Sequence, residues 1–176
     1  MFTFIRRMVG AALLNSNTYE EVEADRGATG QALAVVLLAS VGTAVGWVGV
    51  TPGRVWTMAV LSVVAVAAWI SWALLTYLIG ALLMPEEQTQ ANPGELLRTL
   101  GFAQAPGILR AFGALGGLGP LVVGVTALWT LATMVVAVRQ ALDYTSTWRA
   151  VGVCIVGWVL SGVIASAFLL VSAVSQ

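Results

Sequence analysis

The residues best suited to chemistry lie inside an apolar stretch, Leu96–Gly113, which reads LLRTLGFAQAPGILRAFG. A guanidinium or an amide is costly to bury in a membrane segment, and such residues usually mark a solute path or a binding site. A second group of charged residues follows near the end of a later apolar run. The candidate functional or structural polar residues are Arg98, Gln104, Pro106, Arg110, Arg139 and Asp143.

Arg98 and Arg110 are too close together to reach opposite faces of a bilayer. They stand twelve residues apart (98 to 110), which is roughly 18 Å of α-helix against a hydrocarbon core of ~30 Å. We expect Arg98 to reach cytosolic headgroups, which leaves Arg110 in the outer half of the core. Pro106 removes a backbone donor, so the segment is predicted to be kinked, short or only partly inserted. Gln104 is expected to bond the loosened backbone, and Arg110 is either functional or a structural anchor.

Arg139 and Asp143 are four residues apart at the end of another apolar run. On a continuous helix this spacing places both side chains on one face. We expect them to form a clamp at the cytosolic boundary of the membrane. The alternative is a binding subsite for an anionic group.

The residue types that are missing exclude most catalytic chemistry. The chain has no histidine, no lysine and one cysteine, Cys154. This removes Schiff-base lysines and every Ser-His or Cys-His pair, and the carboxylates cluster outside the apolar runs. We therefore expect no enzyme activity, no cofactor and no metal site, and the net charge of zero argues against nucleic-acid binding.

The composition identifies the class of protein. Of the 176 residues, 59% are apolar and 9% are charged, whereas a soluble domain has about 25% charged residues. Several runs approach the ~20 apolar residues that cross a bilayer as a helix. We predict an all-α polytopic membrane protein, with an N-terminal segment of residues 1–26 and a transmembrane domain of residues 27–174. The five predicted transmembrane helices are about residues 28–50, 55–84, 95–115, 119–142 and 148–172.

Residues 2–14 are predicted to form an amphipathic helix that lies in the membrane interface, with Arg6 and Arg7 towards lipid phosphates. The apolar run after the arginines is too short for a cleaved signal peptide. Thr18 and Glu21 have the spacing of a capping box. The apolar face of the N-terminal helix comprises Phe4, Ile5, Met8, Val9, Ala12 and Leu13. The acidic residues after it form either a solvated linker helix or a docking surface: Glu20, Glu21, Glu23 and Asp25.

Arginine placement predicts the orientation, because cytosolic loops carry an excess of positive charge. With a cytosolic N-terminus, six arginines face the cytosol and two, Arg54 and Arg110, lie outside. We therefore expect a cell (inner or plasma) membrane protein whose N-terminus is cytosolic and whose C-terminus is external. Asn92, Pro93 and Glu95 have the spacing of a strong helix start before the third span.

Small residues and indoles indicate how the spans associate. Gly42 and Gly46 lie on one face of the first span and favour close helix packing. Buried indoles need an acceptor, and we expect an interhelical hydrogen-bond network that includes Trp69, Trp72, Trp129 and Trp158. The alternative is a polar pathway for a solute. The expected acceptors are Gln104, Ser62, Ser71, Thr76, Thr126 and Thr133.

The chain resembles the Yip domain family, membrane proteins named for their interaction with Ypt/Rab GTPases, and a short bacterial-type member in particular. Three segments carry the resemblance: TYEEVEADRGATGQALAVVLLAS, LLRTLGFAQAPGIL and LWTLATMVVAVRQALDYTSTWRAV. The resemblance implies a cytosolic N-terminus, five helices and no catalytic residues. The chain lacks the long cytosolic N-terminal region of the eukaryotic members, which argues against GTPase binding.

Three functions are consistent with the sequence. The first is a non-enzymatic membrane organiser or scaffold that acts through helix packing and through contacts with lipid, a second copy or other membrane proteins. The second is a small transporter or channel subunit with a polar path near Gln104 and Arg110. The third is an accessory subunit of a larger membrane complex.

Overall fold

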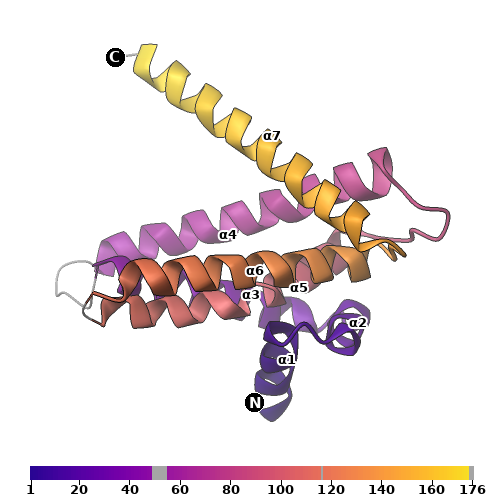
Figure 1. The fold of residues 1–176 in the computed structure, drawn as a ribbon, viewed down its shortest axis with the longest axis horizontal. Helices are drawn as coiled ribbons and strands as arrows, with labels where there is room; N and C mark the ends of the chain where they lie inside the picture. The colour runs from indigo at the N-terminus through magenta and orange to yellow at the C-terminus, as the bar shows by residue number, and fades with distance from the viewer. Residues whose placement is uncertain (49–54, 116, 175–176) are drawn as a thin grey trace.

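The computed structural model describes residues 1–48, 55–115 and 117–174, and every secondary-structure element in these ranges is helical. Two short helices, α1 (Phe2–Ala12) and α2 (Ser16–Ala24), precede a bundle of longer segments (Figure 1). The bundle consists of α3 (Ala28–Val48), α4 (Val55–Tyr77), the π-helical η1 (Leu78–Leu83), α5 (Pro93–Phe102), the 3₁₀-helical η2 (Ala105–Ala114), α6 (Gly119–Ala141) and α7 (Thr147–Val174).

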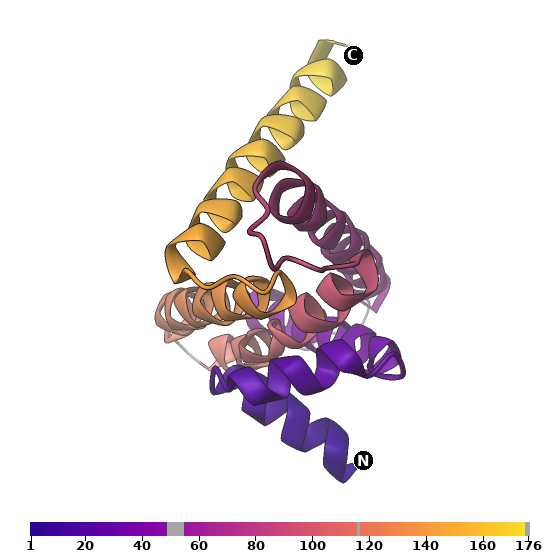
Figure 2. The same cartoon turned by 90° about the vertical axis from the view of Figure 1, so that its right-hand side faces the viewer.

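Successive segments of the bundle run back and forth along one axis (Figure 1). The ends of η1 and α6 and the starts of α3, α5 and α7 lie at the same end of this axis as α2 (Figure 1), and we call this end the α2 end. Helix α7 diverges from the other helices towards the C-terminus, and α1 runs across the bundle axis (Figures 1 and 2). The N-terminal helices therefore cover one side of the bundle, and α7 leaves it on the other.

Three helical segments in the described part of the chain are long and apolar enough to cross a membrane: Ala28–Gly46, Trp56–Leu83 and Gly119–Ala141. These correspond to the first, second and fourth predicted spans. Helix α7 covers the fifth predicted span, and its first half, Thr147–Ser161, is apolar. The prediction of helices in these four regions is confirmed.

The third predicted span is not one helix. Helix α5 ends at Phe102, and η2 begins at Ala105 with Pro106 as its second residue. The proline cannot donate to an α-helical carbonyl four residues back, so the chain continues as a tighter 3₁₀-helix. The prediction that this span is kinked or short is confirmed.

Helix α5 begins with the capping residues that the sequence predicted for the start of the third span. The side chain of Asn92 accepts a hydrogen bond from the Glu95 backbone N–H at 3.1 Å, and the Glu95 carboxylate accepts one from the Asn92 backbone N–H at 2.8 Å. Pro93 occupies the first helical position. These are the three features of the predicted helix start.

The capping box predicted at Thr18 is wrong. Helix α2 begins earlier, at Ser16, and its N-cap residue is Asn15. Thr18 is buried inside the helix, and its side chain packs against Gly10 of α1. Since Glu21 pairs with arginines of α1, neither residue is available to cap the helix.

Small residues let α3 and η2 approach closely, and this pair has the most extensive contact among the described segments. A Cβ atom added to Gly42 would lie 2.6 Å from the Ile108 carbonyl oxygen, and one added to Gly46 would overlap the Arg110 carbonyl. On the other side of the interface, a Cβ on Gly107 would lie 3.1 Å from the Cβ of Ala39. The prediction that Gly42 and Gly46 serve close helix packing is confirmed.

Substituting Gly42 with alanine tests this interface. We expect Gly42→Ala to lower the free energy of unfolding by roughly 1–3 kcal/mol, because the new methyl group meets backbone that cannot move aside. Gly30→Ala in the same helix is the matched control, since a Cβ there meets nothing within 4 Å. Thermal unfolding in detergent measures both variants, and equal midpoints for the two would contradict the packing.

Candidate functional site at the α2 end

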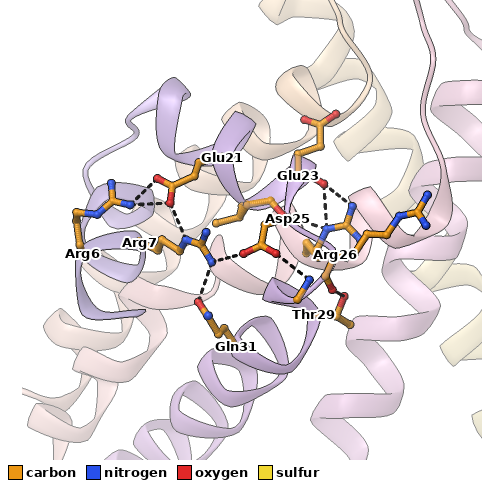
Figure 3. A network of polar contacts seen from close by, with 11 residues as sticks. Arg6, Arg7, Glu21, Glu23, Asp25, Arg26, Thr29 and Gln31 are labelled. Atoms are coloured by element: carbon orange, nitrogen blue, oxygen red, sulfur yellow. Dashed lines mark hydrogen bonds and ion pairs between the residues drawn. The ribbon is translucent and has the colours of Figure 1, made fainter. Parts of the chain in front are cut away.

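The two arginines of α1 are held by carboxylates of the segment that follows it (Figure 3). Arg6 donates to Glu21 at 2.6 Å, and Arg7 donates to the same carboxylate at 2.9 Å. Arg7 also contacts Asp25 at 2.8 Å and the side-chain oxygen of Gln31 at 3.2 Å. Because Arg7 is only 7% exposed, the expectation that both arginines face lipid phosphates is wrong.

These ion pairs change the acidity of the carboxylates. Hydrogen bonds from Arg6 and Arg7 hold the pKa of Glu21 below its ordinary value. A hydrogen bond from Arg7, with one from the Gly27 backbone N–H, does the same for the pKa of Asp25. Glu21 and Asp25 therefore stay ionised and tie α1 to the turn that leads into α3.

Arg98 binds the end of α2 instead of reaching headgroups. It is 6% exposed, and its Nε lies 3.0 Å from the carbonyl oxygens of both Val22 and Glu23. A second guanidinium nitrogen also contacts the Glu23 carbonyl. The last carbonyls of a helix have no partner within the helix, so a buried cation there caps α2 and fixes it against α5. The prediction for Arg98 is wrong.

The predicted clamp between Arg139 and Asp143 is also wrong. Helix α6 ends at Ala141, and Asp143 adopts a left-handed conformation with φ of 52° in the turn beyond it. The two residues therefore do not share a helix face. Arg139 instead donates to the carbonyl of Tyr144 at 3.2 Å, and Asp143 lies 3.4 Å from the Gln90 backbone N–H.

An open pocket of about 390 Å³ lies between α2, the start of α5 and the end of α6. Four carboxylate side chains and one guanidinium line it, so its surface is predominantly acidic. Among the described residues, no group of three or more acidic, histidine or cysteine side chains has the geometry of a metal site. The lining residues are Glu20, Glu23, Ala24, Glu95, Arg139, Gln140, Asp143 and Tyr144.

Burial raises the pKa of Glu23 in this pocket to about 7, and the nearby carboxylates of Glu95 and Asp143 add to the effect, while Arg98 opposes it. The folded state thus binds a proton at Glu23 more readily than the unfolded chain, whose ordinary value is 4.5. The stability that this proton confers is fully present below that ordinary value. It is lost as the pH rises through the folded-state pKa.

The pH dependence of stability tests the site. Between pH 5.5 and 8 we expect the wild-type melting temperature to fall as the pH rises, because Glu23 becomes charged among other carboxylates. Glu23→Gln is expected to remove most of this fall, whereas Glu87→Gln in the exposed loop after η1 is expected to keep it. A wild-type protein whose stability is flat or rises over this range would contradict the assignment.

The remaining candidate residues lie away from the pocket. Gln104 and Pro106 are at the break between α5 and η2, and Arg110 is further along η2. Arg110 donates to the Thr43 hydroxyl of α3 at 3.4 Å. The structure therefore places Arg98, Arg139 and Asp143 at the α2 end and does not unite them with Arg110.

At the break between α5 and η2, the side chain that bonds the free backbone carbonyl is a threonine of α6. The prediction named Gln104 for this role. The Thr133 hydroxyl of α6 is fully buried and lies 2.7 Å from the carbonyl oxygen of Ala103. The indoles also use backbone acceptors: Trp69 donates to the Leu97 carbonyl at 3.1 Å, and Trp129 donates to the Ala12 carbonyl at 2.7 Å. The expectation of side-chain acceptors for these two indoles is wrong.

Tyr19 and Tyr144 are buried hydrogen-bond donors, a role that the sequence did not predict for either of them. The Tyr19 hydroxyl lies 3.0 Å from the Ala11 carbonyl oxygen, and the Tyr144 hydroxyl lies 2.8 Å from the Met84 carbonyl oxygen. Tyr19 joins α2 to α1 across a turn, and Tyr144 joins the turn after α6 to the end of η1. The available signal was an aromatic hydroxyl in an otherwise polar segment, because a tyrosine that is buried needs a partner for its O–H group.

Comparison with protein-family models, with curated proteins and with solved structures gives no match for this chain.

Proposed function

We propose that the chain is a non-enzymatic membrane organiser of the Yip type, which crosses the bilayer five times and inserts α1 into the cytosolic leaflet. One observation carries the proposal: α1 displays an apolar face while its arginines are occupied within the protein. The three long apolar helices support an integral membrane protein. The resemblance of the three sequence segments supports the family and the number of crossings.

The apolar residues of α1 divide into two stripes. Phe4, Met8 and Ala12 pack against the buried core, and the ring of Phe4 lies 6.4 Å from that of Phe102. The second stripe is exposed, from 46% at Ile5 to 85% at Phe2. A helix with one docked stripe and one free apolar stripe is suited to lie in an interface. The exposed stripe comprises Phe2, Ile5, Val9 and Leu13.

Helix α1 contacts α6 at the position along the bundle axis where the exposed apolar surface of α6 begins. Trp129, which binds the end of α1, precedes the end of α6 by twelve residues (129 to 141), or roughly 18 Å. The exposed apolar residues of α6 lie further from the α2 end than this level, and the turns of α6 nearer that end are largely buried. The exposed residues are Leu121, Val125 and Leu128.

The third crossing is supported by length. A ten-residue α-helix and a ten-residue 3₁₀-helix extend roughly 35 Å together, because a 3₁₀-helix rises ~2.0 Å per residue. This matches the ~30 Å hydrocarbon core. Segment α5–η2 therefore has the reach of a transmembrane element although neither helix does alone.

Charge supports a cytosolic α2 end. The described arginines that make contacts there are Arg6, Arg7, Arg98, Arg139 and Arg149. This is the excess that the positive-inside rule assigns to the cytosol. Arg54 lies outside the described residues, so its predicted external position rests on the sequence.

A label on α1 tests the proposal. In proteoliposomes of a Cys154→Ser background, we expect a fluorophore at Val9→Cys to be quenched by brominated lipid and shielded from iodide. A fluorophore at Asn17→Cys, on the exposed polar start of α2, is the matched control and is expected to show the opposite pattern. Equal access of iodide to both positions would contradict insertion of α1.

A further inference from the structure

The side chain of Arg110 extends along α3 towards the α2 end, and not towards the end of η2 at Ala114. Its backbone carbonyl lies against Gly46 of α3, yet its guanidinium reaches back to Thr43, one turn of α3 nearer the α2 end. The guanidinium carbon lies 3.9 Å from the position of a Cβ on Gly107. Thr43 is fifteen residues beyond Ala28, or roughly 22 Å along α3. The guanidinium therefore lies between η2 and α3, where it is half-buried.

Among the described residues, the guanidinium of Arg110 has few hydrogen-bond partners. Its Nε is buried and has no hydrogen-bond partner among the described residues. Its one described side-chain contact is the long one to Thr43, whose hydroxyl donates to the Ala39 carbonyl at 2.9 Å. An arginine carries five N–H donors in a planar fork, and that fork matches a phosphate or carboxylate group.

The counter-charge cannot come from an acidic side chain of this chain. All eight Asp and Glu residues lie in residues 20–25, 86–95 and 143, which gather at the α2 end. A second copy in the same orientation has the same distribution of carboxylates. A half-buried guanidinium without a counter-charge is unfavourable in an apolar surrounding, so an anion from outside the chain would stabilise it.

We propose that Arg110 and Thr43 form a binding site for a phosphate group, supplied by an anionic lipid or by free phosphate. The surroundings of the site suit a lipid tail, because apolar side chains of η2 on both sides of Arg110 are exposed: Leu109, Phe112 and Leu115. The fork of Arg110 binds two phosphate oxygens, and the Thr43 hydroxyl turns from Ala39 to donate to a third. The site lies apart from the α2 end and does not depend on the insertion of α1.

Titration of the delipidated protein in a maltoside detergent tests the site. Short-chain phosphatidylglycerol, a diacylglycerol of the same chain length and inorganic phosphate are the three probes, and binding is read by the melting temperature and by native mass spectrometry. We expect phosphatidylglycerol to bind and diacylglycerol not to bind. Inorganic phosphate that binds as tightly as phosphatidylglycerol identifies free phosphate as the source, and phosphatidylglycerol binding alone identifies the lipid.

Variants connect the binding to the residues. We expect Arg110→Gln to bind about tenfold more weakly or worse, which is the loss expected for a charge-assisted hydrogen bond. Arg110→Lys keeps the charge without the fork, and its affinity is expected to lie between those of the wild type and Arg110→Gln. Thr43→Val is expected to weaken binding less than Arg110→Gln does. Arg149→Gln at the α2 end is the matched control and is expected to bind like the wild type.

Two results would overturn the proposal: a wild-type protein that binds neither phosphate probe, or binding that Arg110→Gln leaves intact. If Arg110→Gln does not fold, Arg110→Lys and Thr43→Val decide the question. Wild-type affinity in both of them would then overturn the site.

Discussion

A helix end or break leaves backbone carbonyls without donors, and an apolar surrounding offers no water to bond them. In this molecule buried and half-buried side chains supply the missing donors. Thr133 bonds the break after α5, Arg98 caps the end of α2, and Trp129 binds the end of α1. Tyr144 lies against the carbonyls at the end of the π-helix η1. The positions of the short N-terminal helices and the break in the third span depend on these contacts.

The same constraint divides the charges between the two ends of the bundle. At the α2 end, arginines meet carboxylates and helix carbonyls, and one stripe of apolar residues of α1 stays exposed. Away from that end, Arg110 lies among apolar side chains with no acidic residue of the chain nearby. The first arrangement supports a structural organiser, and the second supports a site for an external anion.

Local patterns predicted the local structure well. The apolar runs marked α3, α4 and α6, the Asn92 and Glu95 spacing marked the start of α5, and Pro106 marked the break. The partners of Arg7 and Arg98 were not predictable, because they depend on how α2 folds back against the bundle. The Arg139 and Asp143 pair failed because α6 ends two residues before Asp143. Sequence spacing shows which residues share a helix face only while the helix continues.

The most direct test compares two buried threonines of α6. The Thr133 hydroxyl lies 2.7 Å from the Ala103 carbonyl oxygen at the break and 2.8 Å from the Thr130 carbonyl oxygen of its own helix. The Thr126 hydroxyl contacts carbonyls of its own helix, with the Val122 carbonyl oxygen at 2.7 Å. If the break depends on a donor from α6, Thr133→Val lowers the free energy of unfolding by about 1–3 kcal/mol and speeds amide exchange at Gly107, and Thr126→Val does neither. Equal unfolding energies and exchange rates for the two variants in nanodiscs would contradict the account.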